Sequence, residues 1–253
     1  MYRQKERSLN AGENSPNEGS PKKNSRRSTK NHILNALPDE DYQRLLPDLE
    51  YVELPYGRFV YHAEEKIKHV YFPDDSVVSV VANTPQGQSV EVGVIGRDGA
   101  TGLSVLLGVD TSFNDAIVQL PDGALRISTE ALLKEFMRAG ALHSLLLRSL
   151  HSYIAQISQI ALCNRLHSIE ERLARWLLMC RDRSKGDHLK LTQEFLALML
   201  GAQRASVTIA AITIQAAGYI KYSRGNIKII DREGLENFAC DCYQIVAGET
   251  KRQ

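Results

Sequence analysis

Residues 191–212, LTQEFLALMLGAQRASVTIAAI, carry two short apolar patterns separated by a single glycine. Thr192 suits the start of the first helix, because its hydroxyl can accept a hydrogen bond from an unpaired N–H of the first turn. Gly201 is placed to end that helix, since glycine takes the left-handed backbone conformation at little cost. The inner stripe of the first helix is expected to be Leu196, Met199 and Leu200. These features predict two helices that meet at a tight corner at Gly201.

The second helix is expected to bury its small and branched side chains against the first. The expected buried residues are Val207, Ala210 or Ala211, Ile214 and Ala217. Its first turns are polar instead, with Gln203, Arg204, Ser206 and Thr208. In a helix-turn-helix this exposed polar start enters the DNA major groove.

Residues 218–231, GYIKYSRGNIKIID, predict a strand, a Ser-Arg-Gly-Asn turn and a second strand. Two helices followed by such a hairpin make a winged helix, and Lys221, Arg224 and Lys228 make the wing basic. A bare helix-turn-helix pattern can also be an ordinary helical corner. The wing and its charge favour a DNA-binding domain over that alternative.

The net charge of +1 conceals an uneven distribution along the 253 residues. Residues 33–164 carry 9 Lys and Arg against 17 Asp and Glu, whereas residues 165–233 carry 12 against 7. A basic C-terminal segment on an acidic middle fits a nucleic-acid-binding unit joined to a regulatory body. The composition is that of a globular protein, with no membrane-length apolar run and no secretory signal, so we expect a cytoplasmic location.

The whole chain divides into four predicted regions. Residues 1–31 are polar and basic and are expected to form a disordered tail. Residues 32–138 open with short helices broken at Pro38 and Pro47, and then change to short β-branched runs with turn signals from Tyr51 to Ser128. Residues 139–165 are expected to form a long helix, and residues 166–253 the winged-helix domain. Ser168 and Glu171 have capping-box spacing at the start of the latter.

The long helix carries more apolar width than one small neighbour would cover. A second copy of the chain, paired along this helix, would use such a surface. The residues expected at this dimerisation seam are Leu146, Leu150, Ile154 and Ile157. The alternative is a helix buried within its own domain.

With the helix-turn-helix, the motifs HVYFPDDSVVSVV, VEVGVIGRDGATGLSVLLG and CDCY resemble the Crp/Fnr family of bacterial transcription regulators. The resemblance runs from about Ile33 to Tyr243. It implies an α+β fold: an antiparallel β-roll like a cyclic-nucleotide-binding jelly roll, a long dimerisation helix and a C-terminal winged helix-turn-helix. It also implies a homodimer on an inverted repeat of double-stranded DNA, with RNA polymerase as a further partner.

The resemblance extends to single residues of the second helix. Arg204 matches the family's base-reading arginine, whose guanidinium can bond guanine O6 and N7 together. Gln203 and Ser206 match positions near bases and phosphates. Ala205 and Ile209 depart, because well-known members carry a charged residue at each, so the operator is expected to differ from the standard one. The DNA-binding residues expected are Thr192, Gln203, Arg204, Ser206, Thr208, Lys221 and Arg224.

Nucleotide-binding members hold the cyclic phosphate with an Arg-Ser pair, where this chain has Asn114-Asp115. A carboxylate there repels a phosphodiester, so control by cyclic AMP is not expected. Arg97 in the GRDG turn could bind an anion, but is expected to be an exposed turn residue. The effector cannot be named.

Other classes of site find less support in the sequence. Cys240-X-Cys242, with Cys163 or Cys180, could hold a metal or act as a redox pair, but this spacing is not a usual zinc or redox motif. We expect buried, reduced cysteines, no metal and no cofactor. A haem ligand such as His62 or His69 is possible in principle, although a lone histidine in a sandwich is usually structural. No catalytic motif indicates an enzyme; a dimeric ligand- or redox-sensing adaptor without specific DNA binding is the main alternative.

Overall fold

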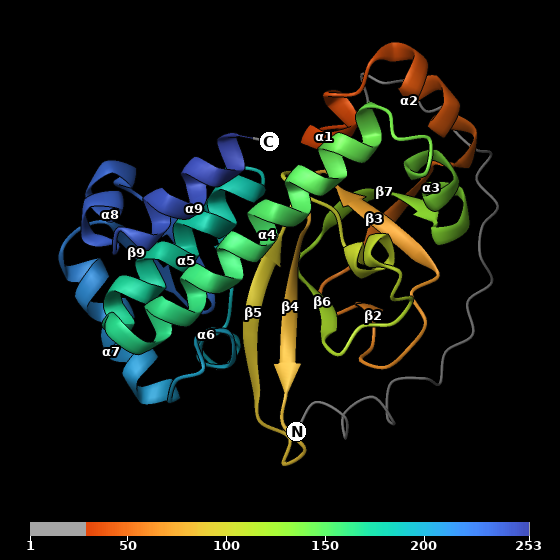
Figure 1. Ribbon diagram of the computed structural model, residues 1–253. Coiled ribbons are helices and arrows are strands. Elements are labelled where there is room, and N and C mark those ends of the chain that lie inside the picture. Colours follow the sequence, from red (N-terminus) through yellow and green to blue (C-terminus); the bar gives the residue numbers. More distant parts are fainter. Residues whose placement is uncertain (1–28, 253) are drawn as a thin grey trace, which may run out of the picture.

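The structure, a computed structural model, describes residues 29–252. It has the predicted α+β class, with antiparallel sheets first and helices after them. Figure 1 shows two lobes: the sheets and the first helices form one, α5 to α9 form the other, and the long helix α4 runs across both.

The first lobe opens with three short turns of helix. They are α1 (His32–Asn35), α2 (Asp39–Leu45) and the 3-10 turn η4 (Leu46–Asp48). Pro38 is the N-cap of α2 and Pro47 lies in η4, so the predicted breaks are confirmed.

Residues 29–31 were expected in the tail but pack on the β-roll. Thr29 Oγ1 donates to Asp74 Oδ1 at 2.8 Å, and the Asn31 side chain donates to the Pro73 and Gly99 carbonyls. The rest of the predicted tail lies outside the described residues.

Two antiparallel sheets form the β-roll. Their strands are β1 (Glu50–Leu54), β2 (Phe59–Tyr61), β3 (His69–Pro73), β4 (Val77–Asn83), β5 (Ser89–Ile95), β6 (Asp115–Leu120) and β7 (Asp122–Ser128). One sheet has the order β1-β7-β3 and the other β2-β6-β4-β5. The 3-10 turn η5 (Leu103–Leu107) lies in the connection between β5 and β6.

Two helices follow the β-roll. The side chain of Ser128 caps α3 (Thr129–Phe136), and α4 (Ala141–Leu166) is the predicted long helix. The N-terminal part of α4 packs on α1 and α3, because Leu142, Leu145 and Leu146 belong to the same apolar core as those helices.

The second lobe contains the predicted winged helix. Its elements are α5 (Ile169–Arg183), β8 (His188–Lys190), α6 (Gln193–Leu200), α7 (Arg204–Ala216), β9 (Ile220–Ser223), β10 (Asn226–Ile229), α8 (Arg232–Phe238) and α9 (Cys242–Lys251). The Ser168–Glu171 capping box is present at the start of α5. The strand β8 was not predicted; it pairs with β10 and extends the wing to three strands in the order β8-β10-β9.

The two lobes share one apolar core. Val77, Val81 and Val94 of the β-roll belong to the same buried cluster as the side chains of α5, α6 and α7. Across this contact, the buried Trp176 Nε1 of α5 donates to Glu91 Oε1 of β5 at 2.7 Å. The winged helix is therefore packed directly against the sheet of its own chain.

Among residues 29–252, no single helix is long and apolar enough to cross a membrane. Only α6 and α7 taken together reach that length and composition, and they are bent by 104° at their junction.

Candidate nucleic-acid interface

The corner between α6 and α7 is built as its sequence predicts. The Thr192 hydroxyl accepts a hydrogen bond from the Phe195 N–H at 3.1 Å and caps α6. Gly201 has φ 57° and ψ 40°, the left-handed conformation expected of it. A side chain there would also collide with β5, because an added Cβ would lie 2.9 Å from Val90 Cγ2. Gly201 thus permits both the turn and the contact with the β-roll.

The inner face of α7 is apolar, as expected. Val207, Ala210, Ala211 and Ile214 are buried. Ala217 was expected among them but is exposed, because α7 ends at Ala216 and the chain turns away through Gly218 at φ 85°. The prediction for Ala217 was therefore wrong.

The outer face of α7 begins with the polar residues that the sequence places in its first turns. Gln203 is the N-cap and Arg204 the first helical residue, and both are exposed. Ser206 and Thr208 are half-buried, and the Thr208 hydroxyl donates to the Arg204 carbonyl at 2.9 Å. Because the first N–H groups of a helix point outward, this end offers both a cation and backbone donors to an anion.

Apolar side chains continue the exposed face of α7. Ile209 is 61% exposed and Ile212 is 58% exposed, and Ala205 is exposed at the start of the helix. Branched side chains left uncovered on a helix of this kind can contact the methyl groups of thymines. Arg204 is the only charged side chain on α7.

The wing carries its basic residues on β9 and β10. Lys221 and Lys228 are register partners across the two strands and are both exposed. Arg224 lies at the turn between them with φ 47° and is also exposed. The Leu191 N–H donates to the Gly225 carbonyl at 2.8 Å, which ties the wing turn to the start of α6 beside Thr192. Basic residues of the wing thus lie at the same end of the lobe as the cap of α6.

The predicted phosphate position in the β-roll is occupied by a carboxylate engaged within the chain. Asp115 accepts hydrogen bonds from the Ala63 N–H at 2.7 Å and from Asn83 Nδ2 at 2.6 Å. Its Oδ1 also lies 3.6 Å from His62 Nδ1, and the His62 ring stacks on Phe59. Asn114 is buried. Within the described residues, these partners of Asp115 include no Arg or Lys side chain that could hold a phosphate.

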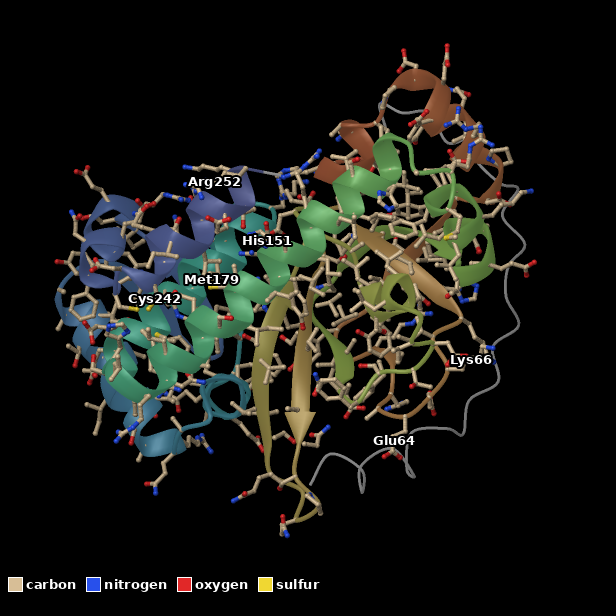
Figure 2. The ribbon with its side chains drawn as sticks, viewed as in Figure 1. Glu64, Lys66, His151, Met179, Cys242 and Arg252 are labelled. Carbon is tan, nitrogen blue, oxygen red and sulfur yellow. The ribbon has the colours of Figure 1, made fainter. Side chains whose placement is uncertain are left out.

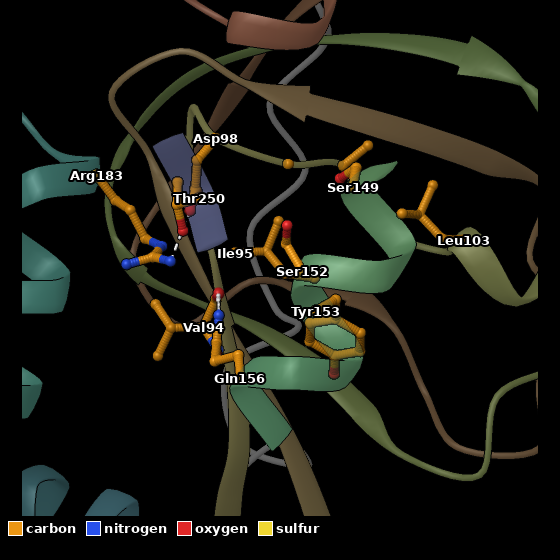
Figure 3. Close-up of a pocket in the computed structure, with 12 residues that line it drawn as sticks. Val94, Ile95, Asp98, Leu103, Ser149, Ser152, Tyr153, Gln156, Arg183 and Thr250 are labelled. Carbon is orange, nitrogen blue, oxygen red and sulfur yellow. Dashed lines mark hydrogen bonds and ion pairs between the residues drawn. The ribbon is translucent and has the colours of Figure 1, made fainter. Parts of the chain in front are cut away.

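A small cavity lies between β5 and α4 (Figure 3). The cavity there measures only about 20 Å³. The Tyr153 ring lies against Gly93, where an added Cβ would be 2.5 Å from Tyr153 Cε2. The Gln156 side chain accepts from the Val94 N–H at 2.6 Å and donates to the Val94 carbonyl at 3.0 Å. Pockets for drug-sized ligands usually measure about 300–1,000 Å³.

Arg97 is not the exposed turn residue that its GRDG context predicts. Its guanidinium forms an ion pair with the buried carboxylate of Asp75 and donates to the Ser184 carbonyl at 2.6 Å. The prediction failed because its partners lie on α5's C-cap and on the β3–β4 turn, far away in the sequence. Arg97 therefore joins the lobes and is already paired.

The predicted dimerisation residues of α4 lie in different surroundings. Leu146 is fully buried in the core of its own chain, so we remove it from the predicted seam. Leu150 is half-buried against that core, Ile157 is half-buried, and Ile154 is 54% exposed. An exposed stripe at helical spacing runs along Leu147, His151, Ile154, Ser158 and Leu162; His151 is labelled on it in Figure 2.

A β-roll, a long helix with an uncovered stripe and a winged helix with an exposed basic start define a transcription-regulator architecture. Residues 171–238 match the family model described as the Crp-like helix-turn-helix domain. The predicted resemblance to the Crp/Fnr family is thereby confirmed, and the chain has the fold of its transcription regulators. No curated protein matches the chain.

Three solved structures of bacterial proteins share the fold. A protein of Eubacterium rectale described as a Crp/Fnr-family transcriptional regulator is 17% identical, with a TM-score of 0.63 over 82% of this chain and 97% of that one. FixK2 of Bradyrhizobium japonicum is 15% identical, with a TM-score of 0.65 over 76% and 98%. CLP of Xanthomonas campestris, described as a c-di-GMP-responsive global regulator, is 17% identical, with a TM-score of 0.61 over 76% and 99%.

Proposed function

We propose that this protein is a sequence-specific DNA-binding transcription regulator that acts as a homodimer on an inverted repeat. In this proposal residues 32–138 are a sensor-like domain, residues 139–165 the dimerisation helix and residues 166–253 the DNA-binding domain. The observation that carries the proposal is the exposed start of α7, where Gln203 and Arg204 are exposed in the same domain as a wing with exposed basic residues.

Arg204 has the chemistry to read a base. Its side chain is free of ion pairs among the described residues, and its fork of donors suits guanine O6 and N7. Lys221 and Arg224 suit phosphate contacts, which position a protein without selecting sequence. The Thr192 hydroxyl oxygen accepts the cap hydrogen bond of α6, so its O–H can still donate to a phosphate.

The dimer is supported by the uncovered apolar stripe of α4. Leu147, Ile154 and Leu162 are 40%, 54% and 43% exposed, respectively, on a helix of 26 residues. A parallel pairing of two such helices would cover these side chains and bring two α7 helices to the same side of the dimer. Half-sites of an operator would then lie about one helical turn of DNA apart, roughly 34 Å.

Control by cyclic AMP or cyclic GMP is not part of the proposal. Asp115 stands where the family resemblance places the phosphate-binding Arg-Ser pair, and Tyr153 and Gln156 lie against β5. CLP is described as responsive to c-di-GMP, whereas the descriptions of the other two structures name no signal, so the fold does not name an effector. RNA polymerase remains a partner only by resemblance.

Operator selection from random double-stranded DNA, with purified protein and no added ligand, tests the proposal. We expect enrichment of an inverted repeat whose affinity for the protein falls as salt rises. The Arg204→Ala variant should lose the enrichment of one base pair in each half-site. A protein that binds no DNA at low salt, or binds all sequences equally, would favour the dimeric adaptor.

A further inference from the structure

Three cysteines and one histidine from distant parts of the sequence converge at one point. Cys163 lies in the last turn of α4 and His167 is its C-cap, while Cys240 and Cys242 flank the junction of α8 and α9. The Sγ atoms and one ring nitrogen all lie within 4.8 Å of one another. Figure 2 places Cys242 where α4, α5 and α9 meet.

The distances within this Cys3His cluster match a single ion. Cys163 Sγ and Cys240 Sγ are 3.5 Å apart, and Cys242 Sγ is 3.4 Å from His167 Nδ1. A tetrahedral zinc site with Zn–S bonds of about 2.3 Å places its sulfur atoms about 3.8 Å apart. A disulfide needs about 2.05 Å, and an iron–sulfur cluster spreads its four ligands over two or more irons, so that all four would not lie within 4.8 Å of one another. The spacing therefore suits one metal ion held directly by all four residues.

The surroundings supply positive charge to the sulfur atoms. Arg172 and Arg175 of α5 are buried, and both interact electrostatically with Cys163. Neither guanidinium forms an ion pair with a carboxylate within residues 29–252. Three thiolates around one divalent ion carry a net charge of −1, which would compensate these buried cations. Besides the cluster, Arg172 donates to the Leu200 carbonyl and Arg175 interacts electrostatically with Glu91.

A hydrogen bond to one sulfur atom of the cluster also suits a metal site. Gln159 Nε2, one turn before Cys163 on α4, donates to Cys242 Sγ at 3.1 Å. N–H donors to ligand sulfur atoms are a regular part of metal sites, because they orient the ligand and spread its charge. Cys163, Cys240 and Cys242 are all buried, whereas His167 is half-buried and gives the cluster a side facing solvent.

We propose that Cys163, His167, Cys240 and Cys242 form a structural zinc-binding site. Four protein ligands would complete the tetrahedral coordination of the ion, as in other structural zinc sites. No coordination position would be left open for a water molecule or a substrate. It would join the end of α4 to the start of α9 and so set the angle between the long helix and the winged helix. The site does not depend on whether the protein binds DNA.

Metal analysis of the full-length protein tests this proposal. The protein is purified without chelator, under reducing conditions, from medium that contains zinc and iron. We expect about one zinc per chain. After metal removal, Co²⁺ should bind with the visible bands of tetrahedral cobalt and a thiolate charge-transfer band.

Variants identify the ligands. Cys242→Ser and the half-exposed His167→Ala should each lower metal affinity by at least the 10- to 100-fold typical of lost outer-shell partners. Cys180→Ser is the matched control, because Cys180 is equally buried but lies outside the cluster, bonded to Gln119. It should keep its zinc. Circular dichroism confirms that each variant is folded before its metal content is compared.

Other outcomes would overturn the proposal. They are wild-type protein that binds neither zinc nor Co²⁺, iron with acid-labile sulfide in place of zinc, a Cys163–Cys240 disulfide in metal-free protein, or folded Cys242→Ser and His167→Ala variants that retain zinc as tightly as Cys180→Ser does.

Discussion

Arg204 is exposed at the first position of α7, where its side chain can reach a base edge. We predict that Arg204→Ala costs about 1–3 kcal/mol of binding free energy at one operator base pair and removes the base preference there. Fluorescence anisotropy with the selected operator and with single base-pair variants measures both effects. Full affinity and selectivity in Arg204→Ala would mean that α7 is aligned differently on the DNA.

Arg224, at the wing turn, is predicted to act in another way. Arg224→Ala should weaken binding to all sequences to a similar extent and lower the salt dependence of binding by about one phosphate contact. Titrations at several salt concentrations give this slope. Lys134→Ala, which removes an exposed lysine from α3 in the other lobe, serves as the control and should leave the slope unchanged.

Glu91 makes stability depend on pH. Burial raises the pKa of its carboxyl from 4.5 to about 7, although hydrogen bonds from Ser79 and Trp176 and the charges of Arg175 and Arg183 act in the opposite direction. The folded state therefore holds this proton more tightly than the unfolded state. The resulting stabilisation is complete below about pH 4.5 and is lost as pH rises through about 7, with an upper limit of about 3 kcal/mol.

Urea unfolding at pH 5 and pH 8 measures this effect. The difference between wild type and Glu91→Gln isolates it, since the amide has a similar shape and does not titrate. We expect the wild type to lose more stability than Glu91→Gln between these two pH values. Equal losses in the two proteins would show that Glu91 does not titrate in this range.

At the scale of elements, α4 has one position, Ile154, where a substitution can test dimerisation without disturbing the core of the chain. Ile154 is 54% exposed, so Ile154→Glu should leave the folded chain intact yet place a charge in the seam of a dimer. We expect sedimentation to show monomers for Ile154→Glu. Leu150 is less suitable, because it packs on its own core and a charge there would also destabilise the chain.

Ile230→Glu is the control for this experiment, since Ile230 is equally exposed, at 54%, but lies beyond the wing. It should sediment as wild type does. A dimer that survives Ile154→Glu would place the interface on another face.

The apolar outer face of α7 also has a consequence for sequence preference. Ile209 lies one turn after Arg204–Ala205 and is 61% exposed, so it can contact a thymine methyl in the major groove. We predict that Ile209→Ser lowers the preference for thymine at one operator position. Each methylene-sized contact that is lost should reduce the binding free energy by about 0.8 kcal/mol or less. Operator selection with the variant measures the change. An unaltered thymine frequency would contradict the contact.

For the whole molecule, we predict that cyclic AMP and cyclic GMP do not switch DNA binding. The cavity between β5 and α4 is about 20 Å³, and Asp115 stands where the family resemblance places the phosphate-binding Arg-Ser pair. A ligand can shift DNA affinity only by binding one conformation more tightly than another. Calorimetry with each nucleotide, and operator binding with and without it, tests this. Micromolar binding together with a tenfold change in operator affinity would refute the prediction.

The sequence alone was sufficient for the fold class, the corner at Gly201, the caps at Thr192 and Ser168, and the two wing strands β9 and β10. These features depend on local backbone chemistry and on the apolar period of neighbouring residues, both of which are visible in a short window of sequence. The polar start of α7 was identified for the same reason.

The tertiary structure decided what depends on residues far apart in the chain. Leu146 fitted a seam by its spacing, but the β-roll covers it; Arg97 fitted an exposed turn, but Asp75 pairs with it. His167 lies 73 residues before Cys240, so no local spacing could place it beside Cys240 and Cys242. Helical periodicity states which side chains share a face, whereas only the packed chain determines what covers that face.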